Sequence, residues 1–257
     1  MSGAEVSNDP KIQDGVTDFG YEQVSVEEKQ ARVREVFDSV AGQYDLMNDL
    51  MSLGIHRVWK DAYLDWLAPS PRHKLLDVAG GTGDIAQLWR KRGGGPVTVC
   101  DINVEMMNVG EARLAERGGD AQIRWVEGNA EDLPFEDGSF DRVTIAFGLR
   151  NVTRIDQALG EFRRVLRPGG RFMCLEFSKP VHRWIDPVYD TYSFKVLPWL
   201  GDKVANDADA YRYLAESIRK FPDQKDMVSR MAKVGFEQIK VRNLSGGIAA
   251  IHSGWRL

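Results

Sequence analysis

The sequence of 257 residues contains only two cysteines and four histidines. Cys100 and Cys174 are too few and too far apart for a disulfide scaffold or for a CxxC metal or redox site. The histidines include no close pair, so no zinc site is predicted. Both cysteines lie in short apolar runs, which predicts buried thiols in strands and favours a reducing, cytoplasmic compartment.

The chain also lacks a basic excess and a long apolar run. Its 34 basic and 38 acidic residues give a net charge of −4, so no nucleic-acid partner is expected. No stretch approaches the roughly 20 consecutive apolar residues that a membrane-spanning helix needs. A composition of 43% hydrophobic and 28% charged residues is that of a globular protein.

Hydrophobic periodicity divides the chain into segments. Residues 1–24 lack such periodicity and are predicted to form a mobile tail, whereas residues 25–257 are predicted to form a single domain. Residues 25–70 are predicted to be a helical cap, because apolar side chains recur there at helical spacing. Residues 180–220 are rich in aromatic side chains, and are interpreted either as additional core or as a lid over the site.

Elsewhere, short apolar runs alternate with amphipathic stretches. The apolar runs predict seven strands, at Leu75–Ala79, Val97–Cys100, Ile123–Val126, Arg142–Phe147, Arg171–Phe177, Gln238–Leu244 and Ile248–His252. This alternation predicts a parallel sheet with helices on both faces. The short glycine link at 245–247 predicts a terminal antiparallel hairpin, and residues 167–170 predict a turn that ends the preceding helix. The expected fold is therefore α/β and Rossmann-like, with a seven-stranded mixed sheet.

The clearest local signal is a glycine-rich loop after the first of these strands. Gly80, Gly81 and Gly83 allow a tight turn and a close approach of a ligand to the backbone. No GK[ST] follows, so the loop is not a Walker A phosphate loop. Its GxGxxA spacing suits both nicotinamide and S-adenosylmethionine (SAM) sites.

Two acidic residues accompany this loop. Asp101 follows Gly83 by 18 residues, at the end of the next strand, where a carboxylate can accept hydrogen bonds from a ribose diol. The alternative is that Asp101 only caps the helix beginning near Val104. Asp77, within the first strand, is expected either to lie beside the cofactor or to be a buried acid that supports the turn.

The segment after the third strand separates the two cofactor classes. Asn129 is followed by an acid and by the sequence 133–135, Leu-Pro-Phe, which suits an adenine edge and an apolar wall. This pattern favours SAM over a nicotinamide cofactor, and no constellation for hydride transfer is identifiable.

Several blocks together resemble the UbiE/MenG C-methyltransferases of ubiquinone and menaquinone biosynthesis. They are Tyr44–Trp59, Asp77–Asp84, Phe147–Val152, Arg164–Gly170, Glu176–Pro180, Val204–Asp209 and Tyr211–Ile218. The resemblance implies a class I SAM methyltransferase fold and SAM-dependent C-methylation of a polyprenylated quinol ring, without a metal. The acceptor is expected to be 2-polyprenyl-6-methoxy-1,4-benzoquinol, demethylmenaquinol or both.

The resemblance also implies a set of cofactor contacts. It assigns SAM contacts to Thr82, Asp101, Asn129 and Ala130, to which the loop pattern adds Asp77, Gly81 and Gly83. Some family members carry Ser where this chain has Ala146, so only a backbone contact is expected at that position.

The candidate catalytic residues are the polar residues of the most specific blocks. Arg150 cannot easily act as a base, because its pKa exceeds 12, but it could stabilise a phenolate or orient a water; a structural salt bridge is the alternative. His56 has a suitable pKa, although packing or capping explains such a residue equally well. Tyr44 is expected to close over SAM.

The lipid tail of the implied substrate leads us to expect peripheral contact with the inner face of the membrane. Trp184, Tyr189, Tyr192 and Trp199 are amphipathic rings of the kind found at such interfaces. Two alternatives remain open: a SAM-binding subunit of a quinone-synthesis complex, and a methyltransferase for another small aromatic acceptor. A homodimer also remains open.

Overall fold

The computed structural model describes residues 15–40, 49, 52, 54–181 and 208–257. Its centre is one sheet with the strand order β5-β4-β3-β6-β7-β9-β8. The strands are β3 (Leu75–Val78), β4 (Val97–Asp101), β5 (Ile123–Glu127), β6 (Phe140–Ala146), β7 (Leu166–Phe177), β8 (Glu237–Leu244) and β9 (Ala249–Arg256). Strands β3 to β7 pair in parallel, and β9 pairs antiparallel with both β7 and β8. The predicted mixed sheet with a terminal hairpin is confirmed.

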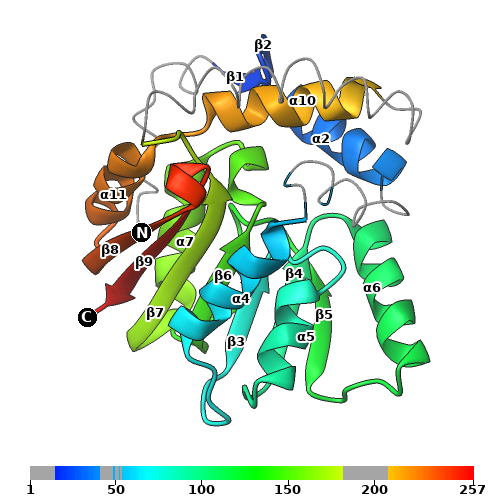
Figure 1. The fold of residues 1–257 in the computed structure, drawn as a ribbon, viewed down its shortest axis with the longest axis vertical. Coiled ribbons are helices and arrows are strands. Elements are labelled where there is room, and N and C mark those ends of the chain that lie inside the picture. The colour runs from blue at the N-terminus through cyan, green and yellow to red at the C-terminus, as the bar shows by residue number, and fades with distance from the viewer. Residues whose placement is uncertain (1–14, 41–48, 50–51, 53, 182–207) are drawn as a thin grey trace.

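Helices cover both faces of the sheet, because successive side chains of a strand point to opposite faces. In β3, Leu75 packs with α4 (His56–Leu67) and α5 (Asp84–Lys91), whereas Leu76 packs with α7 (Ile155–Val165) and α11 (Gln224–Lys233). The helix α6 (Val104–Glu116) follows β4. Figure 1 shows α2 (Val26–Val40) and α10 (Ala208–Lys220) lying together above the sheet, near the carboxyl ends of its parallel strands.

The predicted N-terminal tail is wrong for residues 16–24. Strands β1 (Val16–Phe19) and β2 (Glu22–Ser25) form an antiparallel hairpin that rests on α10. The Phe19 and Tyr213 rings stack with centroids 4.1 Å apart, and the Tyr21 N–H donates to the Glu216 carboxylate at 3.0 Å. Two strands of four residues are too short for a visible alternation, so only contact with a distant helix reveals this hairpin. Residues 1–14 lie outside the described part of the chain.

The predicted turn at residues 167–170 lies within a strand instead. Strand β7 already begins at Leu166, and its register with β6 shifts between Phe140 and Arg142. Gly169 has φ +77°, which lets the chain form this irregularity without leaving the sheet. Of the predicted aromatic insertion, residues 208–220 form α10, and residues 182–207 lie outside the described residues. Trp184, Tyr189, Tyr192 and Trp199 fall in that segment.

Candidate functional site

A cleft opens at the carboxyl ends of β3, β4 and β6. It encloses about 850 Å³ of empty space, including its open mouth, which is within the range of about 300–1,000 Å³ typical of small-molecule sites. The predicted site residues Gly81, Asp101, Asn129 and Ala130 all line it. Helix α2 covers one side with apolar side chains such as Phe37. We call this space the main cleft.

The glycine loop and its acid are joined directly. The Gly81 N–H donates to Oδ2 of Asp101 at 2.8 Å, and the Asn103 N–H donates to Oδ1 at 2.9 Å. Burial raises the pKa of the Asp101 carboxyl, which the two N–H donors oppose. The capping alternative for Asp101 is wrong, because Asn103 is the N-cap of α6 and accepts the Met106 N–H at 2.9 Å.

Gly81 and Gly83 contribute to the loop in different ways. Gly81 and Gly83 have φ +53° and +76°, in the left-handed region that favours glycine. A Cβ on Gly83 would lie 2.6 Å from the Trp125 ring, so the loop packs against β5 only without a side chain there. Gly83 supports the loop in this way, and Gly81 faces the main cleft.

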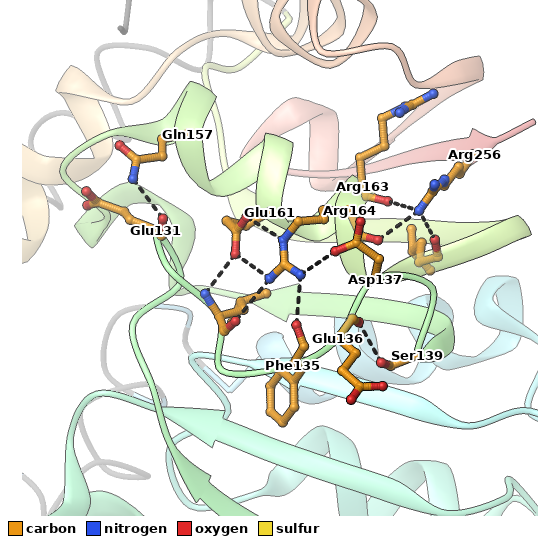
Figure 2. Close-up of polar contacts among 12 residues, drawn as sticks. Glu131, Phe135, Glu136, Asp137, Ser139, Gln157, Glu161, Arg163, Arg164 and Arg256 are labelled. Atoms are coloured by element: carbon orange, nitrogen blue, oxygen red, sulfur yellow. Dashed lines mark hydrogen bonds and ion pairs between the residues drawn. The ribbon is translucent and has the colours of Figure 1, made fainter. Parts of the chain in front are cut away.

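The loop that carries Asn129 and Ala130 is fixed by α7 (Figure 2). Glu161 accepts the Leu133 N–H at 2.9 Å, and Arg164 donates to the Phe135 carbonyl and to the Asp137 carboxylate, each at 2.8 Å. Within the loop, Oδ1 of Asn129 accepts the N–H of Glu131 at 2.9 Å. These bonds fix one wall of the main cleft, although the loop that forms this wall is neither helix nor strand.

A smaller cleft adjoins the main one, and Ala79 and Phe147 line both. The predicted residues Asp77, Thr82 and Ala146 line the smaller cleft. The Thr144 hydroxyl donates to Oδ1 of Asp77 at 2.8 Å, while Oδ2 is buried without a hydrogen-bond partner among the described residues. Burial raises the pKa of Asp77 to about 7.

Sequence analysis missed two charged residues of the smaller cleft. Nζ of Lys60 lies 2.8 Å from Oδ2 of Asp84, and the Lys60 side chain is only 8% exposed. A signal exists in hindsight: Lys60 follows His56 by four residues on one helix, so both side chains share a face. Asp84 is the first residue of α5, directly after the glycine loop.

The backbone between the two clefts is strained. Ala79 and Phe147 have φ +48° and +56°, although neither is glycine. Both follow the carboxyl ends of neighbouring strands, β3 and β6. Non-glycine residues in this region are uncommon and cluster at functional sites, because the surrounding structure must enforce them.

Arg150 forms a buried salt bridge, as the structural alternative to a substrate contact predicts. Its side chain is 2% exposed, and Nη1 donates to the Glu176 carboxylate at 2.9 Å and also to the Phe147 carbonyl. Arg150 does not line the main or the smaller cleft. Its neighbour Asn151 does line the main cleft, and accepts the Tyr213 O–H at 3.1 Å.

Of the other two catalytic candidates, the structure describes only His56. His56 is buried, and its Nδ1 lies 2.8 Å from the Ser52 hydroxyl. Burial, followed by the charge of Lys60, lowers the pKa of His56 to about 4, so the ring is neutral at physiological pH. Tyr44 lies outside the described residues.

In the described part of the chain, no group of three or more His, Cys, Asp or Glu side chains is arranged to hold a metal ion. No helix there combines the length and the apolar character needed to cross a membrane.

Solved structures support the fold. A methyltransferase in complex with the Haloferax volcanii Trm112 methyltransferase activator superposes with a TM-score of 0.62 at 15% identity, covering 87% of this chain and 97% of that one. A SAM-dependent methyltransferase from Thermotoga maritima gives 0.60 at 18% identity, with coverage of 87% and 99%. At such identities the likeness concerns the fold alone.

Other proteins are far more similar to this chain in sequence than these solved structures are. Proteins from Acidiphilium cryptum (strain JF-5) and Brucella abortus (strain S19), both named ubiquinone/menaquinone biosynthesis C-methyltransferase UbiE, are each 55% identical over 93% of this chain. The matches cover 96% and 90% of those two proteins. The sequence model of the ubiE/COQ5 methyltransferase family matches residues 24–256. This chain therefore belongs to the ubiE/COQ5 methyltransferase family.

Proposed function

We propose that the protein transfers a methyl group from SAM to a ring carbon of a polyprenylated quinol, in ubiquinone or menaquinone biosynthesis. The observation that carries this proposal is the Asp101 carboxylate, held at the mouth of the main cleft by the amide of the glycine loop. The names of the two 55% identical relatives support the same reaction.

The main cleft suits the nucleoside part of SAM. Backbone N–H groups of the loops fix both Asp101 oxygens in position, and we assign these oxygens to the hydroxyl groups of a ribose diol. We assign the adenine to the wall formed by Asn129 and Ala130, which α7 holds in place.

The smaller cleft suits the amino-acid part of SAM. A zwitterion needs an acceptor for its ammonium group and a cation for its carboxylate, and this cleft offers Asp77 and Lys60. Oδ2 of Asp77 is buried and has no partner among the described residues, so an ammonium would satisfy it. Lys60 brings a positive charge to this cleft, where its Nζ lies 2.8 Å from Oδ2 of Asp84. We assign Thr82 and the backbone of Ala146 to the same part of the ligand.

SAM supplies an electrophilic methyl group on a sulfonium. In the transfer, the ring carbon forms a bond to the methyl carbon while the sulfur–methyl bond breaks and S-adenosylhomocysteine leaves. The ring proton then passes to water. The protein contributes mainly by holding both partners in a cleft that α2 covers on one side. We assign Asn151 to the quinol oxygen, because the hydrogen bond from Tyr213 fixes the orientation of its amide.

Of the candidate catalytic residues, Arg150 is best understood as a positioning residue. Its guanidinium holds the carbonyl of Phe147, a strained residue that lines both clefts. His56, with a pKa of about 4, is a weak base at neutral pH, and packs between Ser52 and the Lys60–Asp84 pair. Tyr44 stays a proposal from the family resemblance.

The direct test combines binding and turnover. Calorimetry with S-adenosylhomocysteine should give one site per chain, and mass spectrometry should detect a product one methyl heavier from a short-tailed demethylmenaquinol or methoxybenzoquinol. Binding without turnover on either quinol would favour the SAM-binding subunit or a different aromatic acceptor. Absence of any binding would refute the proposal.

We also propose a peripheral membrane contact near the start of α4. Ile55 and Val58 are 41% and 65% exposed, close to the residues of α4 that reach the smaller cleft. A lipid tail held there could remain in the bilayer while its ring enters the main cleft. Sedimentation with anionic liposomes should recover the protein, and Val58→Glu should reduce the bound fraction.

A further inference from the structure

Five side chains of α4 and of the sheet strands β6 to β9 alternate between arginine and tryptophan. They are Arg242 of β8, Trp66 of α4, Arg171 of β7, Trp255 of β9 and Arg142 of β6. We call this set the Arg–Trp ladder. Figure 1 shows the starting end of β7 and the final end of β9 at the lower edge of the sheet, away from α2 and α10. None of the five ladder residues lines the main or the smaller cleft.

Each guanidinium in the ladder lies over an indole ring. Arg242 is 4.1 Å from the Trp66 ring centroid, and Arg171 is 5.0 Å from the same ring. Arg171 also lies 5.3 Å from the Trp255 centroid. Arg142, the last residue of the row, lies 5.5 Å from the Trp255 ring centroid. All four distances are within the range of about 6 Å for cation–π attraction.

The three arginines of the ladder form no ion pair within the part of the chain that the structure describes. By contrast, the buried Arg150 pairs with the Glu176 carboxylate. Among the described residues, no ion pair includes Arg142, Arg171 or Arg242, whose polar partners are neutral groups such as the Ser253 hydroxyl. The Nε of Arg142 is buried and has no hydrogen-bond partner there.

Burial lowers the pKa of Arg142, and Asp141, the smaller effect, raises it and so offsets part of this charge. Asp141 forms its ion pair with Arg167, and Glu237, opposite Trp255 in the β8–β9 register, forms no ion pair with the ladder. Burial lowers the pKa of Arg171 to about 10, and the charges of Arg142 and Arg242 act in the same direction. An external anion would relieve this repulsion.

We propose that the Arg–Trp ladder docks an acidic segment of a partner protein. Tryptophan and arginine are enriched among the residues that dominate protein interfaces, and a guanidinium binds a carboxylate through two parallel hydrogen bonds. Arg242 is exposed, and Trp66 and Trp255 are partly exposed. An acidic segment can therefore reach the Arg242 end of the ladder and the edges of both indole rings. A membrane is the weaker candidate, because the main cleft opens at the other end of the sheet.

The test uses the full-length protein and a fluorescein-labelled hexaglutamate peptide as the probe, read by fluorescence anisotropy at low salt. Arg242→Glu should weaken binding about tenfold or more, because it reverses the most accessible charge. The matched control is Arg124→Glu on β5, the other edge strand, which makes the same charge change at an exposed position. The control should keep its affinity within about twofold of the native chain.

Four outcomes contradict the proposal. Equal losses in both variants would indicate only a general charge effect, and no peptide binding by the native chain would remove the docking site. Binding to anionic vesicles in place of the peptide, lost in Arg242→Glu, would make the ladder a membrane contact. A dimer that dissociates in Arg242→Glu would make it a contact between copies of this chain. Methyl transfer by Arg242→Glu should be unchanged, and circular dichroism should show the native fold.

Discussion

Strand β7 contributes to two groups of charged residues. We call the group that contains Asp77, Asp101 and Glu176 the acidic end, and the Arg–Trp ladder the basic end. Its first half contributes Arg171 to the Arg–Trp ladder, and its last residues contribute Glu176 beneath the main cleft. At the carboxyl end, Asp77 and Asp101 line the clefts. An acidic end suits a cationic methyl donor, whereas a basic end suits an acidic partner, so one sheet can serve two ligands without competition.

The two ends also stabilise their charges by different means. The carboxylates at the acidic end receive hydrogen bonds from loop amides, from a hydroxyl or from a paired arginine. The guanidiniums at the basic end lie on indole faces and bond neutral oxygens. Hydrogen-bonded carboxylates are fixed in position, which a binding site needs, while planar cations on aromatic rings keep the capacity to bind a further anion.

The largest effect is expected from breaking the buried ion pair at the acidic end. Arg150→Met should lower the free energy of unfolding by about 3–5 kcal/mol, because Glu176 would remain buried without its partner. Urea denaturation measures this. As a control, Arg92→Met, which breaks half-exposed pairs with Asp61 and Asp65, should cost no more than about 1 kcal/mol. Native stability of Arg150→Met with lost turnover would instead assign Arg150 to the substrate.

The next largest effect concerns the cofactor. Asp101→Ala should weaken S-adenosylhomocysteine binding by at least about 100-fold, because two hydrogen bonds to a charged group are worth about 1.5–3 kcal/mol each. Titration calorimetry gives the affinity. Asp120→Ala, at the Arg90–Asp120 pair away from both clefts, provides the matched control and should bind as the native chain does.

The smaller cleft can be tested by removing part of the ligand. Lys60→Met should weaken S-adenosylhomocysteine binding about tenfold, since a charge-assisted bond to the carboxylate is lost. Binding of 5′-methylthioadenosine, which lacks the amino-acid part, should not change. A matched loss for both ligands would mean that Lys60 only supports the loop through Asp84. Lys91→Met, at the far end of α5, should affect neither ligand.

Asp77 links pH to both binding and stability. With a folded-state pKa of about 7 against 3.8 unfolded, the folded chain holds a proton between about pH 4 and 7 that the unfolded chain has lost. The stability of the native protein should therefore fall as pH rises through this window. Asp77→Asn should gain stability relative to the native chain from pH 5 to pH 8 in thermal denaturation. The same variant should lose the rise in S-adenosylhomocysteine affinity that ionisation of Asp77 gives near pH 7.

The smallest effect belongs to the basic end. Arg242→Gln should lower the free energy of unfolding by only about 0.5–1 kcal/mol, the value of an exposed cation–π contact. A loss above about 2 kcal/mol in urea denaturation would mean that the ladder is a structural clamp between α4 and the sheet, and would weaken its assignment as a docking site.

Prediction from sequence succeeded where local signals agree. Alternating apolar runs gave the seven strands, and the glycines with Asp101 gave the loop that lines the main cleft. It failed for the β1–β2 hairpin, whose register depends on contact between Phe19 and the distant Tyr213. The sequence left open whether Asp101 caps α6, and the structure excludes this because Asn103 is the cap.

The sequence by itself determined the order of strands and helices, the position of the glycine loop and the family, because these depend on local periodicity and on contiguous motifs. Only the tertiary structure decided that Lys60 joins Asp77 in one cleft, that Arg150 is buried against Glu176, and that three arginines alternate with two tryptophans. These groups come from elements far apart in the chain. Their charges are defined by burial and by neighbours, and both exist only once the sheet has formed.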